Sequence, residues 1–157
     1  MTSHADAAQK LPLHSELPVA MTWDIAAIYK SLVDWETDFA KIDGLLARAT
    51  AFKGRLGEAP EVLAEAFKAS DELDRLVERI YNYAHLLSDE DTSISAHRAL
   101  VDRASAKYAE ISGELSWFEP ELTELPEERL REYLACDELK FYRRTLTEIM
   151  REKPHTL

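Results

Sequence analysis

The strongest restriction on the fold of this chain is a long apolar stripe that follows Pro60 and contains no glycine or proline. Its members recur every three or four positions, which is the spacing of one face of an α-helix. They are Val62, Leu63, Ala66, Phe67, Leu73, Leu76, Val77, Ile80, Tyr81, Ala84 and Leu87. Pro60 suits the first position of such a helix. The stripe predicts a helix of about 27 residues, or ~40 Å, which must bury its apolar face against similar partners.

Segments on both sides of this stripe have the same periodicity. Ser31 is a good N-cap for a preceding helix, and Gly54 and Gly57 mark the exit from it. Its stripe consists of Trp35, Phe39, Ile42, Leu46 and Ala49. After the segment SDEDTS, a third long helix is expected from about Ser93 to Phe118, with Pro120 just beyond it. Its stripe consists of Ile94, His97, Leu100, Val101, Ala104, Tyr108, Ile111, Leu115 and Phe118.

Shorter helices are expected towards the C-terminus. Pro126 suits the first position of one of them, and Asp137 is expected to cap the last. The chain has only 4 glycines and 6 prolines, and no segment alternates as a strand would. The expected fold class is therefore all-α: an antiparallel bundle of long helices with short capping helices.

The length of 157 residues favours one domain. Residues 1–21 are polar with interspersed prolines and are expected to form an extended, partly flexible leader. Residues 22–157 are expected to form a single helical domain. It would begin with a short turn capped by Thr22 or Asp24. Its anchors would be Trp23, Ile25, Ile28 and Tyr29.

The charge balance narrows the classes of partner. The net charge of −11 comes from 30 acidic and 19 basic side chains. This field disfavours nucleic acid and anionic membranes, and it is compatible with cationic peptides. No run of about 20 apolar residues could cross a bilayer, and no signal peptide is evident. Together with a single cysteine, these features lead us to expect a cytoplasmic location.

Residues able to bind metal or act as nucleophiles are few. His85 and His97 flank one predicted turn and could approach each other, but two histidines would leave a zinc ion underligated. Two packed histidines are the favoured interpretation, with a metal or peptide site as the weaker alternative. Cys136 has no histidine close in sequence, so a small packed side chain is favoured over a catalytic thiol.

Two further clusters have structural explanations. The acidic residues Asp89, Glu90 and Asp91 lack the spacing of a calcium loop and are expected to form a turn that caps a helix. Tyr81 is expected to pack in the core, and Tyr83 to be half-exposed. No residue is assigned a catalytic, cofactor-binding or metal-ligating role.

Four ordered stretches resemble the N-terminal region of the oligoendopeptidase F family, M3-type zinc metallopeptidases of the thimet oligopeptidase clan. They are TWDIAAIY from Thr22, LVERIYNYAHLLSDEDTS from Leu76, SWFEPEL from Ser116 and EIMREKPHTL from Glu148. The resemblance implies an enzyme that hydrolyses short peptides, in which a helical N-terminal lobe helps to wall the substrate channel. It implies that an HExxH helix and a downstream glutamate bind the catalytic zinc.

These 157 residues contain no HExxH, so no catalytic or metal-binding residue carries over from the family. The resemblance therefore predicts a non-catalytic fragment with no cofactor of its own. Its partners would be a C-terminal catalytic domain that binds zinc, and short peptides in the intact enzyme. The alternative is a stand-alone interaction or dimerisation module, with Trp117, Phe118, Phe141 and Tyr142 as its candidate surface.

Overall fold

The computed structural model describes residues 16–153, and the regular structure in this range is entirely helical, which confirms the all-α prediction. The α-helices are α1 (Leu32–Phe39), α2 (Ile42–Thr50), α3 (Pro60–Glu90), α4 (Ser95–Glu114), α5 (Phe118–Glu124), α6 (Glu127–Ala135) and α7 (Arg143–Glu152). Short 3₁₀ helices are η2 (Val19–Met21), η3 (Ile25–Ala27) and η4 (Asp137–Tyr142). No helix in this range is long and apolar enough to cross a lipid bilayer.

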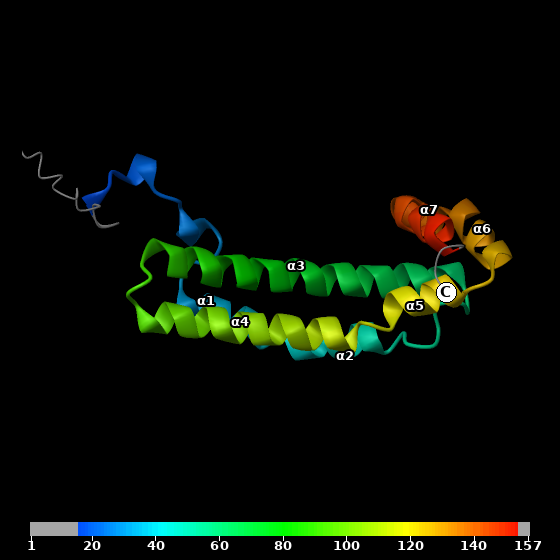
Figure 1. Ribbon diagram of the computed structural model, residues 1–157, viewed down its shortest axis with the longest axis horizontal. Coiled ribbons are helices and arrows are strands. Elements are labelled where there is room, and N and C mark those ends of the chain that lie inside the picture. The colour runs from blue at the N-terminus through cyan, green and yellow to red at the C-terminus, as the bar shows by residue number, and fades with distance from the viewer. Residues whose placement is uncertain (1–15, 154–157) are drawn as a thin grey trace, which may run out of the picture.

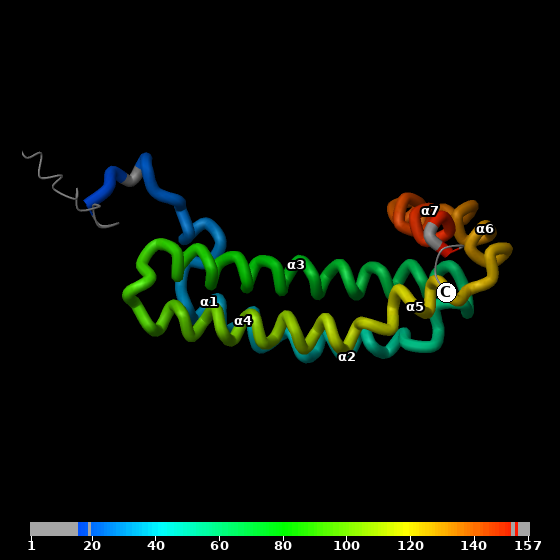
Figure 2. The backbone as a smooth tube through the Cα atoms, in the orientation of Figure 1, coloured from blue at the N-terminus to red at the C-terminus, as the bar shows by residue number. Residues whose placement is uncertain are grey.

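The architecture is an antiparallel α3–α4 hairpin with other helices packed along it and at one end (Figure 1). Helices α1 and α2 follow the long axis of the hairpin, and both contact α3. The tube view shows α5, α6 and α7 gathered where α3 begins, whereas the blue N-terminal segment lies near the opposite end (Figure 2). Helix α3 therefore packs against helices from both the N-terminal and the C-terminal parts of residues 16–153.

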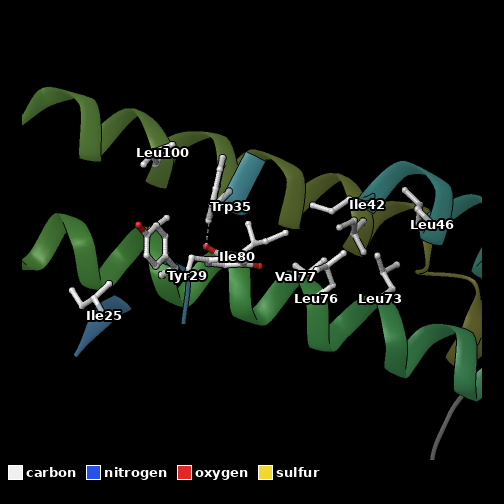
Figure 3. Packing of buried hydrophobic residues seen from close by; sticks show 14 residues of the cluster. Ile25, Tyr29, Trp35, Ile42, Leu46, Leu73, Leu76, Val77, Ile80 and Leu100 are labelled. Atoms are coloured by element: carbon white, nitrogen blue, oxygen red, sulfur yellow. Dashed lines mark hydrogen bonds between the residues drawn. The ribbon is translucent and has the colours of Figure 1, made fainter. Parts of the chain in front are cut away.

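Helix α3 agrees closely with the sequence prediction. It contains 31 residues, and Pro60 is its first residue, where the missing backbone N–H costs nothing. Its apolar residues belong to two different cores. The bundle core lies between α3 and the helices α1, α2 and α4, and Figure 3 shows its packing. The end core lies between the first turns of α3 and the helices α5, α6, η4 and α7.

The helix predicted from Ser31 is broken in two. Ser31 is the N-cap as expected, and its Oγ accepts the backbone N–H of Asp34 at 3.3 Å. The chain then turns at Ala40 and Lys41, before α2 starts. Each helix is short and buries its own part of the apolar stripe, which includes Trp35 on α1 and Ile42 on α2. The prediction of one continuous helix was therefore wrong. The break could not be seen in the sequence, because neither residue of this turn is glycine or proline.

The predictions for the C-terminal half also need correction. The third long helix ends at Glu114, and α5 is a separate helix. Pro120 lies inside the first turn of α5, where proline is tolerated, rather than beyond a helix. Asp137 does not cap the last helix, because it begins η4, and α7 starts only at Arg143. Pro126 is the residue just before α6, within one position of its predicted place.

Of the two tyrosines of α3, Tyr81 packs against the bundle core as predicted, although it is only half-buried, whereas the prediction of a half-exposed Tyr83 was wrong. Tyr83 is buried, and its ring meets Tyr29 edge-on with 5.2 Å between centroids. Tyr81 is half-buried and lies 5.9 Å from the ring of Tyr108 on α4. Tyr83 follows Ile80 by three positions and so continues the face that points into the bundle core.

The anchors of the N-terminal turn are only partly as predicted. Ile25 and Tyr29 are buried in the bundle core, and Ile28 packs against it. Trp23 is 78% exposed, so its predicted role as an anchor was wrong. Asp24 lies at the N-cap of η3, but its side chain makes no capping hydrogen bond.

Glu121 on α5 holds the loop between α2 and α3. Its two carboxylate oxygens accept the backbone N–H groups of Gly54 at 2.7 Å and Leu56 at 2.8 Å. Gly54 has a φ of 78°, a conformation that glycine adopts without strain. The carboxylate therefore ties the base of α3 to α5.

Replacing Glu121 with glutamine is expected to lower the free energy of unfolding by about 1–2 kcal/mol, because one of the two charge-assisted bonds loses its acceptor. The matched control is Glu119→Gln on the same helix, whose carboxylate has no ion-pair partner among residues 16–153. Urea denaturation followed by circular dichroism measures both. Equal effects of the two substitutions would contradict this role of Glu121.

Candidate functional site

A groove of about 1000 Å³ lies where α3, α4 and α5 meet. Val77 from α3, Tyr108 and Ile111 from α4, and Phe118 from α5 supply apolar walls. The hydroxyl groups of Ser70, Ser112, Ser116 and Thr123 also line it. We call this cavity the α3–α4–α5 groove. Its size and mixed lining are typical of sites that bind small molecules or peptide side chains.

Asp74 is the carboxylate that α3 contributes to this groove. Asp74 is exposed overall, but partial desolvation raises its pKa above the ordinary value, and the nearby charges of Asp71 and Glu78 raise it further. No cation within residues 16–153 pairs with it. Asp71, by contrast, accepts the phenol O–H of Tyr142 at 2.7 Å. Asp74 is therefore a carboxylate in the groove without a counter-charge from the described part of the chain.

The other charges of the groove are also mainly negative. Glu119 and Glu124 of α5 line it, together with one cation, Lys153. The Nζ of Lys153 donates a hydrogen bond to the backbone carbonyl of Leu125. The groove thus combines three carboxylates, one ammonium group and an apolar wall.

Aromatic side chains continue from the groove along the α3–α4 hairpin. Tyr108 is 55% exposed and faces Tyr81. Tyr81 in turn packs against His85, with ring centroids 4.2 Å apart. Of these three rings, Tyr108 is exposed, whereas Tyr81 and His85 are half-buried.

A second charged cluster, around Asp38, is structural. Its carboxylate accepts hydrogen bonds from the Tyr29 hydroxyl at 2.9 Å and from Lys41 Nζ at 2.6 Å, and it pairs with Arg79. Burial opposes ionisation of Asp38, but these partners outweigh it and hold its pKa below the ordinary value. Burial, reinforced by the bond to Asp38, raises the pKa of Tyr29 to about 12. Every member has a partner, so the cluster joins α1 to α3.

The histidines at the turn do not form a metal site in the described structure. The Nε2 atom of His85 and the Nδ1 atom of His97 are buried without a hydrogen-bond partner in the protein. In residues 16–153 no three side chains of the histidine, cysteine, aspartate or glutamate type lie close enough to hold one metal ion. The structure thus offers these two histidines no third ligand.

The remaining candidates lie in ordinary structural settings. The Sγ of half-buried Cys136 donates to the carbonyl of Glu132 at 3.3 Å. The carboxylate of Asp91 accepts the backbone N–H of Ser93 at 2.9 Å and its hydroxyl at 2.5 Å. The bond from the Ser93 hydroxyl is the main reason why the pKa of Asp91 is lowered. These contacts are typical of a turn between two helices. The prediction that Asp89, Glu90 and Asp91 form a capping turn was wrong in part, because Asp89 and Glu90 are the last residues of α3 and no side chain caps the start of α4.

The aromatic residues suggested for self-association do not form one exposed patch. Trp117 and Phe118 are half-buried against the end core, and Tyr142 stacks on Phe67 with centroids 4.3 Å apart. Phe141 is 82% exposed. The groove itself was not predicted from the sequence. Asp74 occupies an unremarkable polar position in the α3 pattern, and the groove depends on the turn that starts α5.

The chain is similar in sequence to bacterial oligopeptidases of one kind. A family model described as oligopeptidase F matches residues 121–157. Over 151 residues the chain is 32% identical to "Oligopeptidase PepF" of Bacillus subtilis, covering 96% of this chain and 22% of that protein. It is 30% identical over 146 residues to "Oligoendopeptidase F, chromosomal" of Lactococcus lactis subsp. cremoris, covering 91% of this chain and 24% of the relative.

Solved structures agree with the sequence matches. A crystal structure of a Chlamydophila abortus protein superposes with a TM-score of 0.82 at 25% identity, covering 94% of this chain and 25% of that one. The crystal structure of oligoendopeptidase-F from Enterococcus faecium has a TM-score of 0.70 at 29% identity, covering 81% of this chain and 25% of that one. The chain thus spans about a quarter of the length of the proteins it matches. In sequence and fold it is similar to the N-terminal region of the oligoendopeptidase F family.

Proposed function

We propose that this chain is the non-catalytic N-terminal helical domain of an oligoendopeptidase F-like zinc metalloendopeptidase. In the intact enzyme it would help to wall the channel that admits short peptides. The observation that carries this proposal is the match to Oligopeptidase PepF, which spans 96% of this chain but 22% of the relative. A catalytic domain, equivalent to the rest of the relative's length, would be its partner.

The donor groups of the described residues do not fit the zinc of such an enzyme. A peptidase zinc needs three protein ligands and an open position for water. The candidates His85 and His97 lack a third donor, and no other suitable group of three exists in residues 16–153. We therefore assign zinc binding and bond cleavage to the catalytic domain, and positioning of the peptide to this chain.

The two sides of the α3–α4 hairpin support a role in shaping a channel. One side is covered by α1 and α2, which complete the bundle core. Elsewhere the hairpin carries the α3–α4–α5 groove and the rings of Tyr81 and Tyr108. A two-helix surface with a groove and with polar and aromatic groups is suited to contact a peptide.

A chimera tests the channel role. The part of the Bacillus subtilis relative that aligns with this chain is replaced by this chain, and the cleavage of quenched fluorescent peptides of increasing length is measured. We expect an active chimera that disfavours long peptides. The matched control lacks the helical region and should lose that discrimination. A folded, active control with unchanged length preference would refute the channel role.

The isolated chain tests the non-catalytic role. With added zinc and a quenched peptide, the purified chain is expected to show no turnover. Activity that survives a second purification and disappears with a chelator would contradict the proposal.

A further inference from the structure

We propose that the α3–α4–α5 groove binds a cationic side chain, lysine or arginine, of a peptide. The inference deepens the proposed function, on which it rests for the choice of a peptide as ligand. It concerns binding by this chain itself, so it can be tested without any catalytic domain.

The first argument is the charge of the groove. Three of its lining side chains are carboxylates, Asp74, Glu119 and Glu124, and none of them has an ion-pair partner within residues 16–153. The one lining cation, Lys153, already donates to the Leu125 carbonyl. A groove with this excess of negative charge attracts a positive ligand and repels an anionic one.

The second argument is the position of Asp74. It lies on α3 between Asp71 and Glu78. Partial desolvation, and then the charges of these two neighbours, make its ionised form less favourable. Asp71 is satisfied by the Tyr142 hydroxyl. A guanidinium or ammonium group placed beside Asp74 would relieve this repulsion and form a charge-assisted hydrogen bond.

The third argument is the apolar wall. The long aliphatic stems of lysine and arginine pack on apolar surfaces while the charged end reaches a polar partner. The exposed ring of Tyr108 and the half-buried side chains of Leu115 and Phe118 offer such a surface in the same groove as Asp74. The tyrosine ring can also attract the cation through its face. Shape and charge therefore favour the same ligand.

Isothermal titration calorimetry on the full 157-residue chain tests the proposal. The probe is a short capped peptide of alanines and arginines, and its counterpart carries glutamine in place of each arginine. We expect binding of the arginine peptide, weaker binding at high salt because charges are screened, and no measurable binding of the glutamine peptide.

Variants locate the site. Asp74→Asn is expected to raise the Kd by about fivefold to tenfold, the range for one partly exposed charge-assisted bond. The matched control is Asp102→Asn, which makes the same change of net charge at an exposed position of α4 that does not line the groove. It should change the Kd less than twofold. Tyr108→Ala, at an exposed position, provides an independent loss of affinity from the apolar wall.

Several outcomes would overturn the proposal: no binding, equal binding of the glutamine peptide, or equal losses for Asp74→Asn and Asp102→Asn. A second copy of the chain in the groove would also overturn it. That copy would appear in sedimentation as a dimer that Tyr108→Ala dissociates. Thermal melts check that each variant folds. Binding by the chain with failure of the chimera would refute the channel role alone, and the reverse result would refute only this inference.

Discussion

Replacing Trp35 with alanine is expected to lower the free energy of unfolding by about 3–5 kcal/mol, the largest effect of any single substitution considered. Trp35 is fully buried, and its indole Nε1 donates to the backbone carbonyl of Ile80 at 3.0 Å (Figure 3). Its ring stacks on Phe39, with centroids 4.9 Å apart, and the guanidinium of Arg103 lies 5.0 Å from it. The substitution would leave a cavity where α1, α3 and α4 meet.

Urea denaturation followed by far-ultraviolet circular dichroism is the suitable measurement, because the substitution removes a fluorescent residue. Trp35→Phe should retain most of the packing but lose the hydrogen bond, at a cost of about 1–2 kcal/mol. Trp23→Ala is the matched control. Trp23 is 78% exposed, so its loss should change stability by less than about 0.5 kcal/mol. Similar losses for Trp35→Ala and Trp23→Ala would contradict the described packing.

Replacing Asp38 with asparagine is expected to cost about 2–3 kcal/mol at neutral pH. The substitution removes the charged acceptor shared by Tyr29, Lys41 and Arg79. Asp43→Asn is the control, because its carboxylate pairs with Lys107 at 3.1 Å but is itself 79% exposed. Exposed pairs of this kind contribute little. The difference between the two variants, measured by urea denaturation, reports the value of the buried carboxylate.

The Asp38 carboxylate is expected to make the free energy of unfolding depend on pH. The folded pKa of Asp38 lies below the ordinary value of 3.8, so its stabilising contribution is complete above that value and is lost as the pH falls through the folded pKa. The pKa of Glu36 is also lowered from its ordinary value of 4.5, chiefly by its hydrogen bond from Arg103, so its stabilising contribution is likewise lost as the pH falls. Asp74 acts in the opposite direction, because its raised pKa means that stability is lost as it ionises with rising pH.

We therefore expect the urea midpoint to fall as the pH is lowered from about 5 towards 2.5, and Asp38→Asn to flatten this fall. Asp74→Asn should make this fall slightly steeper, because protonation of Asp74 offsets part of it in the parent chain, and it should be neutral or slightly stabilising at pH 7. An Asp38→Asn variant with the full acid dependence of the parent chain would show that other carboxylates carry it.

The sequence predicted the helices where strong local signals agree. Pro60 and the long stripe located α3, and Ser31 located the start of α1. The break at Ala40 was missed because neither Ala40 nor Lys41 is a helix-breaking residue, and the break after Glu114 was missed although Gly113 lies just before it. The burial of Tyr83 was missed for a related reason: its contact with Tyr29 comes from outside the helix.

The candidate site was harder to predict than the helices. Asp74 resembles any solvent-facing acid in a helical pattern, and its setting arises only when α5 folds across the base of the hairpin. Residue pairs far apart in sequence, such as Asp74 and Glu124, carry no periodic signal that links them. The residues that did stand out in the sequence were His85, His97 and Cys136. They do not belong to any group of three metal-binding side chains within residues 16–153.

Because α3 is divided between two cores, the two parts of the molecule are expected to unfold locally with different free energies. Each core surrounds a different stretch of one continuous helix, with Leu63, Ala64, Ala66 and Phe67 in one and the residues from Leu73 onward in the other. Amide hydrogen exchange should therefore detect two cooperative units. The segment from α5 to α7 would detach at a lower free energy than the segment from α1 to α4, while the distal turns of α3 stay protected.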